Sequence, residues 1–231
     1  ATGPTLGTWT ATRQASRMGR APYLYDASVG AGLGIMGRLR DLVRTGDRVH
    51  EIEAVLSGTL SFVMTRMRGG ALFSEAVRAA RDAGLTEPDV RDDLSGRDVA
   101  RKLVLLAHEV GLEADAVEIE SLIPAGLEDV PLETFWERLS ESDAEWKQRL
   151  EGADEVQYVA RVGADGAVRA GVEPIDRTSL LAALGPSEIA VAVRTERSAQ
   201  HPVFFQGPGA NVEVTSSVVL ADIVRAAEGI R

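Results

Sequence analysis

The feature that most constrains the fold is a hairpin signal in the C-terminal half of the chain. Two strand-like runs, 157–163 and 167–173, flank an Ala-Asp-Gly turn at 164–166, and Asp-Gly between two such runs is typical of a tight β-hairpin. Two further strand-like runs follow at 188–195 and 202–206. Hairpin-connected strands beside helical segments favour an α+β domain, in which helices cover one face of a mixed β-sheet.

The N-terminal half alternates strand and helix patterns. Residues 23–29 are predicted as a strand, which a glycine-rich turn joins to a helix over 35–44. Apolar and acidic residues alternate over 50–56, as in a half-buried strand. The longest helix is expected at 95–111, and a final helix is expected at 214–228.

The composition excludes several classes of protein. The 231 residues are 45% hydrophobic, which is enough for a packed core, and they contain no cysteine, which excludes disulfides, thiolate nucleophiles and cysteine-ligated metals. A formal charge of −10 opposes binding to nucleic acid. The chain lacks the roughly 18 consecutive apolar residues of a membrane helix and lacks a signal-peptide pattern. We therefore expect a cytoplasmic protein with neither a nucleic-acid nor a membrane partner.

Residues 86–102 concentrate charge, with five carboxylates and four cationic side chains in seventeen positions. One interpretation is a solvated loop, in which Ser95 and Asp98 form a capping box and Asp98 and Lys102 form a surface ion pair. Helical spacing favours another interpretation. Leu105 continues the row of Asp98 and Lys102, so the row is partly covered and the pair lines a cleft. A lysine beside a carboxylate in a cleft can hold or deliver a proton.

Two further carboxylates are expected in the same cleft. Pro88 holds Glu87 in an extended conformation, which lets Glu87 point toward the cleft together with Asp93. A group of carboxylates around a lysine suits a substrate that bears an ammonium group. The segment therefore predicts an enzyme acting on a small amino compound.

The segment 87–102 closely resembles the signature of the homoserine dehydrogenase family. Further segments at 25–33, 56–62 and 207–210 fit the family, and the resemblance runs from Trp9 to the C-terminus. The Leu-Ser-Gly-Thr-Leu-Ser run at 56–61 is most similar to the dehydrogenase portion of bifunctional aspartokinase–homoserine dehydrogenases. The resemblance implies reversible reduction of aspartate semialdehyde to homoserine with NADPH or NADH, in threonine and methionine biosynthesis, by a homodimer.

The resemblance also implies residue roles. Lys102 would give a proton to the carbonyl oxygen as hydride arrives, and Asp98 would orient both the substrate and Lys102. Glu87 and Asp93, with Asp98, would bind the amino-acid end of the substrate.

The glycine-rich turn has three interpretations. Residues 32–37 spell Gly-x-Gly-x-x-Gly between a predicted strand and a helix, which is the pattern of a dinucleotide-binding loop in a hydroxy-acid dehydrogenase. The family resemblance implies instead a site for a monovalent cation such as sodium, although Gly34 replaces the family's usual proline. The third interpretation is an ordinary tight turn. The implied cation ligands are the Asp26 carboxylate and the carbonyl oxygens of Val29, Ala31 and Leu33.

A second glycine motif precedes the last helix. Backbone amides at a helix N-terminus can approach a cofactor phosphate or ring, so Gly207, Gly209 and Ala210 are expected to contact NADP or NAD. Asn211 stands where the family usually has another glycine. The alternative is a simple strand-to-helix turn.

The resemblance predicts three regions. Residues 1–40 would be the residual end of a Rossmann-type nucleotide-binding domain with the glycine turn, and 41–206 the catalytic, substrate-binding and dimerisation domain. Residues 207–231 would return toward the nucleotide-binding domain, most of which is missing from this sequence. A rival hypothesis is therefore a catalytically incomplete homologue that binds an amino acid or only dimerises.

Overall fold

The chain folds into one sheet with helices, as a computed structural model of residues 23–112, 117–153 and 155–229 describes. The elements follow in this order: η1 (Asp26–Ser28), α2 (Ile35–Arg44), β1 (Val49–Val55), α3 (Gly58–Arg68), α4 (Phe73–Asp82), α5 (Val90–Leu94), α6 (Arg97–Glu109), β2 (Val117–Ile119), α7 (Leu132–Arg138), η2 (Leu139–Ser142), α8 (Asp143–Arg149), β3 (Val156–Val162), β4 (Val168–Pro174), β5 (Glu188–Thr195), β6 (Val203–Pro208) and α9 (Val212–Gly229).

The sheet is mixed, as predicted. Its six strands lie in the order β2-β4-β3-β1-β5-β6, with β2 parallel to β4 and the other neighbours antiparallel. The predicted hairpin joins β3 to β4, where Val162 pairs with Val168 and Gly166 adopts a φ of 78°. That left-handed conformation is one that glycine adopts without strain.

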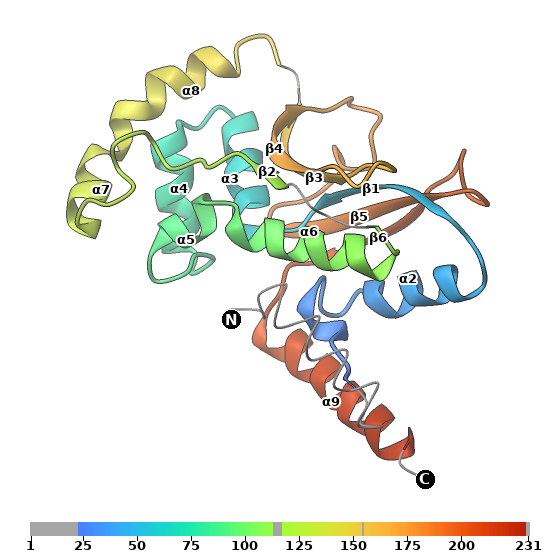
Figure 1. Cartoon of the computed structure of the whole chain (residues 1–231). Helices are drawn as coiled ribbons and strands as arrows, with labels where there is room; N and C mark the ends of the chain where they lie inside the picture. Colours follow the sequence, from blue (N-terminus) through green and yellow to red (C-terminus); the bar gives the residue numbers. More distant parts are fainter. Residues whose placement is uncertain (1–22, 113–116, 154, 230–231) are drawn as a thin grey trace.

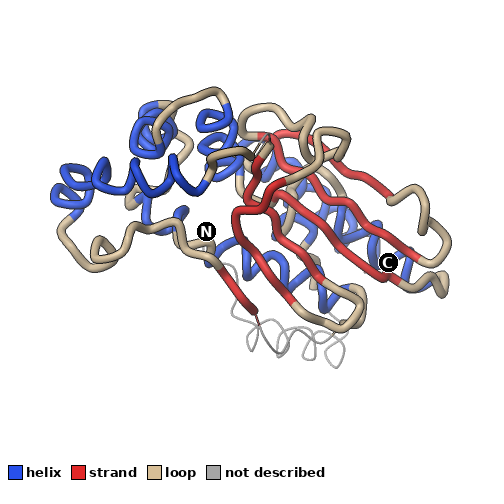
Figure 2. Tube along the Cα trace, turned by 90° about the horizontal axis from the view of Figure 1, so that it is seen from above, coloured by secondary structure: helices blue, strands red, loops and turns tan. Residues whose placement is uncertain are grey.

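The helices α2, α3 and α6 lie along one face of the sheet (Figures 1 and 2). Ile52 and Ala54 of β1 are fully buried in the same core as Leu103 and Leu106 of α6. Alternate residues of a strand point to opposite faces, so the helices cover one set of side chains. The expected arrangement, with helices on one face of a mixed sheet, is confirmed.

The opposite face of the sheet bears no helix in the described part of the chain and faces the viewer in Figure 2. Leu181 and Leu184, from the loop before β5, cover Val55 and Val159 there. Charged residues also lie on this face, where Arg161 pairs with three carboxylates on neighbouring strands. These are Glu51 at 3.7 Å, Glu53 at 2.6 Å and Glu173 at 3.0 Å.

The prediction of a strand over 23–29 is wrong. The described residues there form only the short 3-10 helix η1, and the chain then turns through Gly30, Gly32 and Gly34, all with positive φ. Asp26 is buried and paired with arginines, so this segment is held by side-chain contacts and does not join the sheet. The aromatic residues in this run led to the wrong prediction of a strand.

Helix α9 projects from the body of the molecule beside η1 (Figure 1). Its outer side carries exposed large apolar residues, namely Val212, Val219, Leu220, Ile223 and Val224. Across the described ranges, no helix combines the length and the apolar character that crossing a membrane requires. Residues 1–22, the predicted end of a nucleotide-binding domain, lie outside the described residues, so the domain boundaries stay a prediction.

Candidate active site

The ammonium group of Lys102, on α6, lies beside Leu56, the residue that follows β1. Its Nζ is 2.7 Å from Asp98 Oδ2, one helical turn earlier, and donates a hydrogen bond to the carbonyl oxygen of Leu56 at 3.0 Å. The i,i+4 spacing of a helix brings the first pair together, and the packing of α6 on the sheet supplies the second contact. An ammonium has three N–H donors, so these two contacts leave one for another acceptor.

The pair is half open to solvent. The Lys102 side chain is 22% exposed and that of Asp98 is 50% exposed, whereas Leu105 and Glu109 further along the same row are buried. The predicted partial covering of this row is therefore confirmed. The predicted cleft stays a prediction, because neither the pocket on the open face of the sheet nor the one at the edge formed by β2 and β4 is lined by this pair.

The start of α6 is fixed by Gly96, and only half of the capping box considered for Ser95 and Asp98 forms, since Ser95 Oγ accepts the Arg97 N–H at 3.3 Å. Gly96 has a φ of 66° as the N-cap, and any Cβ there would collide with the hydroxyl group of Tyr158. Tyr158 is buried and donates a hydrogen bond to the carbonyl oxygen of Glu120 at 2.7 Å. Asp98 pairs with Lys102, so it does not complete a cap with Ser95. Only glycine fits this combination of backbone conformation and close approach.

Asp93 holds the acidic loop in place. Its Oδ2 accepts the backbone N–H of Glu87 at 2.8 Å, and its Oδ1 accepts the Thr59 hydroxyl at 3.0 Å. Thr59 Oγ1 also lies 2.6 Å from the carbonyl oxygen of Leu85. Burial raises the pKa of Asp93, and the nearby charges of Glu87 and Asp92 act in the same direction against these hydrogen bonds. The described contacts of Asp93 are therefore internal to the loop and α3.

Glu87 is exposed, and its backbone is the part that Asp93 holds. Its carboxylate makes no hydrogen bond with any described residue, which leaves it available to a ligand. The structure thus brings Glu87 and Asp93 together, and separately Asp98 and Lys102. The segment after β1 links the two pairs, because Leu56 accepts from Lys102 and Thr59 donates to Asp93.

The glycine motif before α9 packs against this linking segment. A Cβ on Gly209 would lie 2.9 Å from the Ser187 carbonyl oxygen and 3.5 Å from the Gly58 Cα, so glycine is required by close approach. The Gly209 N–H donates to the same Ser187 oxygen at 3.0 Å. Ser187, with a φ of 62°, is the only non-glycine residue among those described that has a positive φ. Sequence reasoning missed Ser187, because no side-chain pattern marks a strained backbone.

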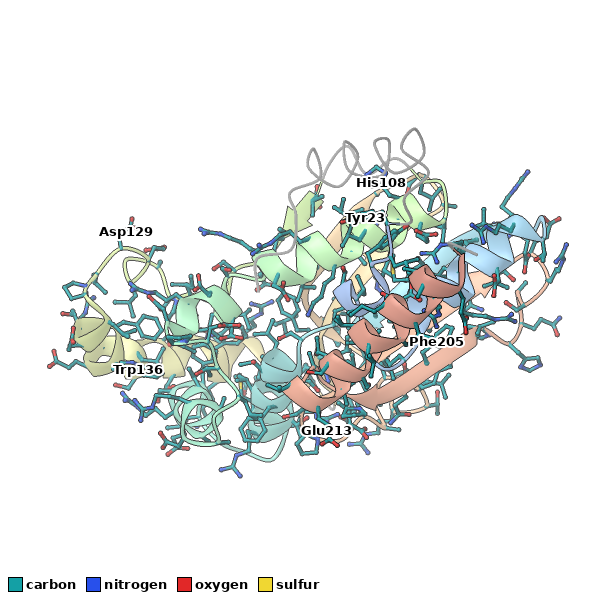
Figure 3. All side chains as sticks on the ribbon, turned by 90° about the horizontal axis from the view of Figure 1, so that it is seen from below. Tyr23, His108, Asp129, Trp136, Phe205 and Glu213 are labelled. Atoms are coloured by element: carbon teal, nitrogen blue, oxygen red, sulfur yellow. The ribbon has the colours of Figure 1, made fainter. Side chains whose placement is uncertain are left out.

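The same motif is less suited to a phosphate than the sequence predicts. Asn211 caps α9, since its Oδ1 accepts the Val214 N–H at 2.9 Å and so uses one of the free helix donors. Glu213 places a carboxylate in the first turn of the helix, where Figure 3 labels it. Both features oppose an anion at this N-terminus. Gly207 lies against Leu33, since a Cβ there would be 2.6 Å from a Leu33 methyl carbon.

The turn after η1 presents oxygen atoms without donors. The carbonyl oxygens of Val29, Ala31 and Leu33 accept no hydrogen bond from a described residue. Asp26 Oδ1 is buried and likewise has no hydrogen-bond partner there, although Arg40 Nη2 is 3.5 Å away. Asp26 Oδ2 accepts from Arg225 at 2.8 Å. Buried acceptors without donors suit a hard cation, so these residues fit the implied site except at Oδ2.

The dinucleotide-loop interpretation of residues 32–37 is wrong. That fingerprint needs a strand before the glycines, and the structure has η1 at this position. Gly32 faces Val214 of α9, because a Cβ there would lie 2.5 Å from a Val214 methyl carbon. The glycines therefore allow α9 to approach the turn.

Comparison with known proteins identifies a family. The family model for homoserine dehydrogenase matches residues 35–224. The bifunctional aspartokinase/homoserine dehydrogenase 2 of Escherichia coli strain K12 is 43% identical over 212 residues, covering 89% of this chain and 26% of the relative. The homoserine dehydrogenase of Emericella nidulans is 40% identical over 241 residues, covering 96% of this chain and 66% of the relative.

Solved structures agree with these relatives. A Candida auris protein of unknown function has a TM-score of 0.90 at 38% identity, covering 96% of this chain and 66% of that chain. A hyperthermophilic archaeal homoserine dehydrogenase in complex with NADPH has a TM-score of 0.71 at 25% identity, covering 95% of this chain and 60% of that chain. This sequence spans only part of the length of each of these proteins. The chain belongs to the homoserine dehydrogenase family.

Proposed function

We propose that this chain supplies the proton-transfer and substrate-binding part of an NAD(P)-dependent homoserine dehydrogenase, which interconverts L-homoserine and L-aspartate 4-semialdehyde. The observation that carries the proposal is the position of Lys102 Nζ, which is held 2.7 Å from Asp98 Oδ2 and 3.0 Å from the Leu56 carbonyl oxygen. Family membership and the NADPH bound to an archaeal relative support the reaction and the cofactor class.

The proton moves through the third N–H of Lys102. The nicotinamide cofactor, NADP or NAD, supplies or takes up the hydride. In the reducing direction the Lys102 ammonium donates a proton to the carbonyl oxygen of the semialdehyde, which becomes the hydroxyl group of homoserine. In the reverse direction neutral Lys102 accepts that proton. Asp98 keeps the amine oriented and balances its charge, and the Leu56 carbonyl oxygen fixes the second N–H.

The acidic loop binds the amino-acid end of the substrate. The exposed Glu87 carboxylate is the group that meets the substrate ammonium, and Asp93 positions Glu87 through the backbone N–H. Asp98 extends the acidic surface toward Lys102. We assign Asp93 to the substrate site as a residue that positions Glu87.

The turn formed by Gly207, Gly209 and Ala210 contacts the cofactor. Its close packing on Gly58 places it beside the segment that links the two acidic pairs. Because Asn211 and Glu213 oppose an anion there, we assign the turn to an uncharged part of the cofactor, such as a ring or ribose. The exposed apolar side of α9 supports a return of this helix toward a nucleotide-binding domain.

The turn from Asp26 to Leu33 binds a monovalent cation such as sodium. Three carbonyl oxygens without described donors, and the buried Asp26 Oδ1, which accepts no hydrogen bond from a described residue, support this assignment. We propose that the chain forms a homodimer through the face of the sheet that bears no helix in the described part of the chain. The biological setting we propose is threonine and methionine biosynthesis in the cytoplasm.

The test is homoserine-dependent reduction of NADP or NAD. The assay compares the chain alone with the same chain joined to the part of the Emericella nidulans relative outside the match, in wild-type form and as Lys102→Ala. We expect turnover from the fusion and its loss in the variant. A folded but inactive fusion would overturn the proposal and favour a catalytically incomplete homologue.

A further inference from the structure

Ser187 adopts a backbone conformation that serine rarely takes. It stands at the second central position of a tight turn, which the Glu188 N–H closes by donating to the Gly185 carbonyl oxygen at 3.2 Å. Pro186 occupies the first central position, and the φ of 62° at Ser187 is the left-handed value that a type II turn needs. Glycine or asparagine usually fills this position, because other side chains are strained in it. The chain therefore keeps a strained residue where glycine would be free of strain.

Neighbouring groups hold the turn in this conformation. Glu188 Oε2 accepts the Gly185 N–H at 2.8 Å and the side-chain amide of Gln206 at 2.9 Å. These two hydrogen bonds lower the pKa of Glu188, so its carboxylate stays ionised and accepts from both donors. The Ser187 hydroxyl makes no hydrogen bond with a described residue. The described polar contacts of Ser187 thus come from its backbone, and a strained backbone that its surroundings enforce is typical of functional positions.

The Ser187 carbonyl oxygen lies in a row of three backbone segments at one end of the sheet. Continuing the antiparallel registers of β1 with β5, and of β5 with β6, beyond the strand ends places Gly58 and Gly209 on either side of Ser187. The contacts agree, because the Gly209 N–H donates to the Ser187 oxygen at 3.0 Å and a Cβ on Gly58 would lie 3.2 Å from the same oxygen. Two glycines thus bring their backbones against one oxygen atom, whose position is set by the left-handed backbone of Ser187.

We propose that Ser187 is a positioning residue, which uses its left-handed backbone to hold the cofactor turn, residues 207–210, against the segment 56–59. This inference rests on the proposed function, in which the cofactor turn contacts an uncharged part of NADP or NAD. The segment 56–59 is the one that links the two acidic pairs of the site. The Ser187 oxygen therefore fixes the bound cofactor relative to the groups that bind and protonate the substrate.

The cofactor turn depends on Ser187 more than the segment 56–59 does. That segment is also held by Lys102, which donates to its first residue, and by Asp93, which accepts from its last. The Gly209 N–H, by contrast, has the Ser187 oxygen as its acceptor. Loss of this contact should therefore loosen the cofactor turn while Lys102 and Asp93 keep their places.

The experiment compares side chains at position 187 that differ in how well they tolerate a positive φ. Ser187→Gly and Ser187→Asn tolerate it, and Ser187→Ala keeps the strain but removes the hydroxyl group. Ser187→Val is branched at Cβ and strongly disfavours it, and Ser187→Thr is a milder branched variant that keeps the test open if valine prevents folding. The control is Gly70→Ala, beyond the other end of α3, where φ is 91° and a Cβ would meet nothing within 4 Å.

Three measurements are made. Steady-state assay of the active fusion gives kcat and the KM values for the cofactor and for homoserine. Calorimetric titration of the same fusion gives the dissociation constant of the cofactor without homoserine. NMR of the chain gives the exchange rate of the Gly209 amide proton, which reports directly on the hydrogen bond to Ser187.

We expect Ser187→Val to raise the KM and the dissociation constant of the cofactor roughly three- to tenfold, the effect of one lost backbone hydrogen bond, and Ser187→Thr to raise them less. The Gly209 amide should exchange faster in both variants. The kcat and the homoserine KM should stay within about twofold of wild type, because Lys102 and Asp93 keep their contacts. The Gly, Asn and Ala variants and the Gly70→Ala control should resemble wild type in all of these values.

Three results would overturn the inference. An active fusion whose valine and threonine variants keep both the cofactor affinity and the Gly209 exchange rate of wild type would show that Ser187 does not position the turn. A loss of cofactor affinity in Ser187→Gly and Ser187→Ala as large as in Ser187→Val would assign the role to the hydroxyl group. Both results leave the proposed dehydrogenase function intact, whereas a folded wild-type fusion without turnover would overturn that function together with this inference.

Discussion

The two ends of α6 hold charged side chains in opposite settings. At the N-terminal end Lys102 and Asp98 are 22% and 50% exposed and pair mainly with each other. At the C-terminal end Glu109 is 4% exposed and is fully engaged by Tyr25 and Arg40. One row of the helix thus passes from open to buried, and the charges at the open end are available for chemistry while those at the buried end tie elements together.

Replacing Lys102 by Ala at the open end should give the largest effect. Loss of a general acid typically lowers turnover by about 10²- to 10⁴-fold. The half-open setting of the pair predicts a change in the free energy of unfolding below about 1 kcal/mol. Steady-state assay of the active fusion and urea unfolding would measure both. A loss of stability that accounts for the lost activity would make Lys102 structural.

Replacing Glu109 by Gln at the buried end should reverse this pattern. The change removes the closer of the two carboxylates that pair with Arg40 and leaves it Asp26 at 3.5 Å. We expect a loss of about 2 kcal/mol in stability, since breaking a buried pair is costly. Turnover of the folded fraction should stay within about twofold of wild type. Equilibrium urea unfolding and an assay at low temperature provide the check, and an unchanged unfolding midpoint would contradict the buried role.

The glycines that flank α6 give a matched comparison. Gly96 and Gly111 have φ of 66° and 80°, but a Cβ on Gly96 would collide with Tyr158 whereas a Cβ on Gly111 would meet nothing within 4 Å. Gly111→Ala should cost about 1 kcal/mol from backbone strain alone, and Gly96→Ala about 1–2 kcal/mol more. Thermal unfolding of both variants tests this. Equal losses would mean that Tyr158 moves aside without cost.

The smallest effect concerns pH. Burial raises the pKa of Asp93 above its ordinary value of 3.8, so the folded state holds this proton more tightly than the unfolded state does. The stability contributed by Asp93 is therefore fully present below pH 3.8 and decreases as the pH rises through the raised pKa. Asp93→Asn should remove that decrease. Urea unfolding of both proteins across this pH range would show it, and parallel curves would contradict it.

Local spacing predicted the part of the site that lies within one helix. The Asp98–Lys102 pair follows from helical geometry, and the partial covering of its row follows from Leu105. The contact of Lys102 with the Leu56 carbonyl oxygen has no local sequence signal, because it depends on how α6 packs on the sheet. The backbone conformation of Ser187 likewise could not be predicted, because it depends on contacts with residues far away in the sequence.

The wrong prediction of a strand over 23–29 also results from contacts between residues far apart in the sequence. Aromatic residues there favour a strand locally, but the fate of the segment is decided by partners far along the chain. Asp26 pairs with Arg225, 199 residues later, and Tyr25 bonds to Glu109. The C-terminal hairpin, by contrast, was predicted correctly because its Asp-Gly turn and flanking strands are adjacent in sequence.

Chemical rescue of Lys102→Ala most directly tests whether Lys102 transfers the proton. The active fusion carrying this variant would be assayed with added methylammonium or, as control, choline, which has the same charge but no N–H proton. We predict that methylammonium restores turnover in proportion to its concentration and that choline does not. Equal rescue by choline, or no rescue of a folded variant by methylammonium, would contradict proton transfer by Lys102.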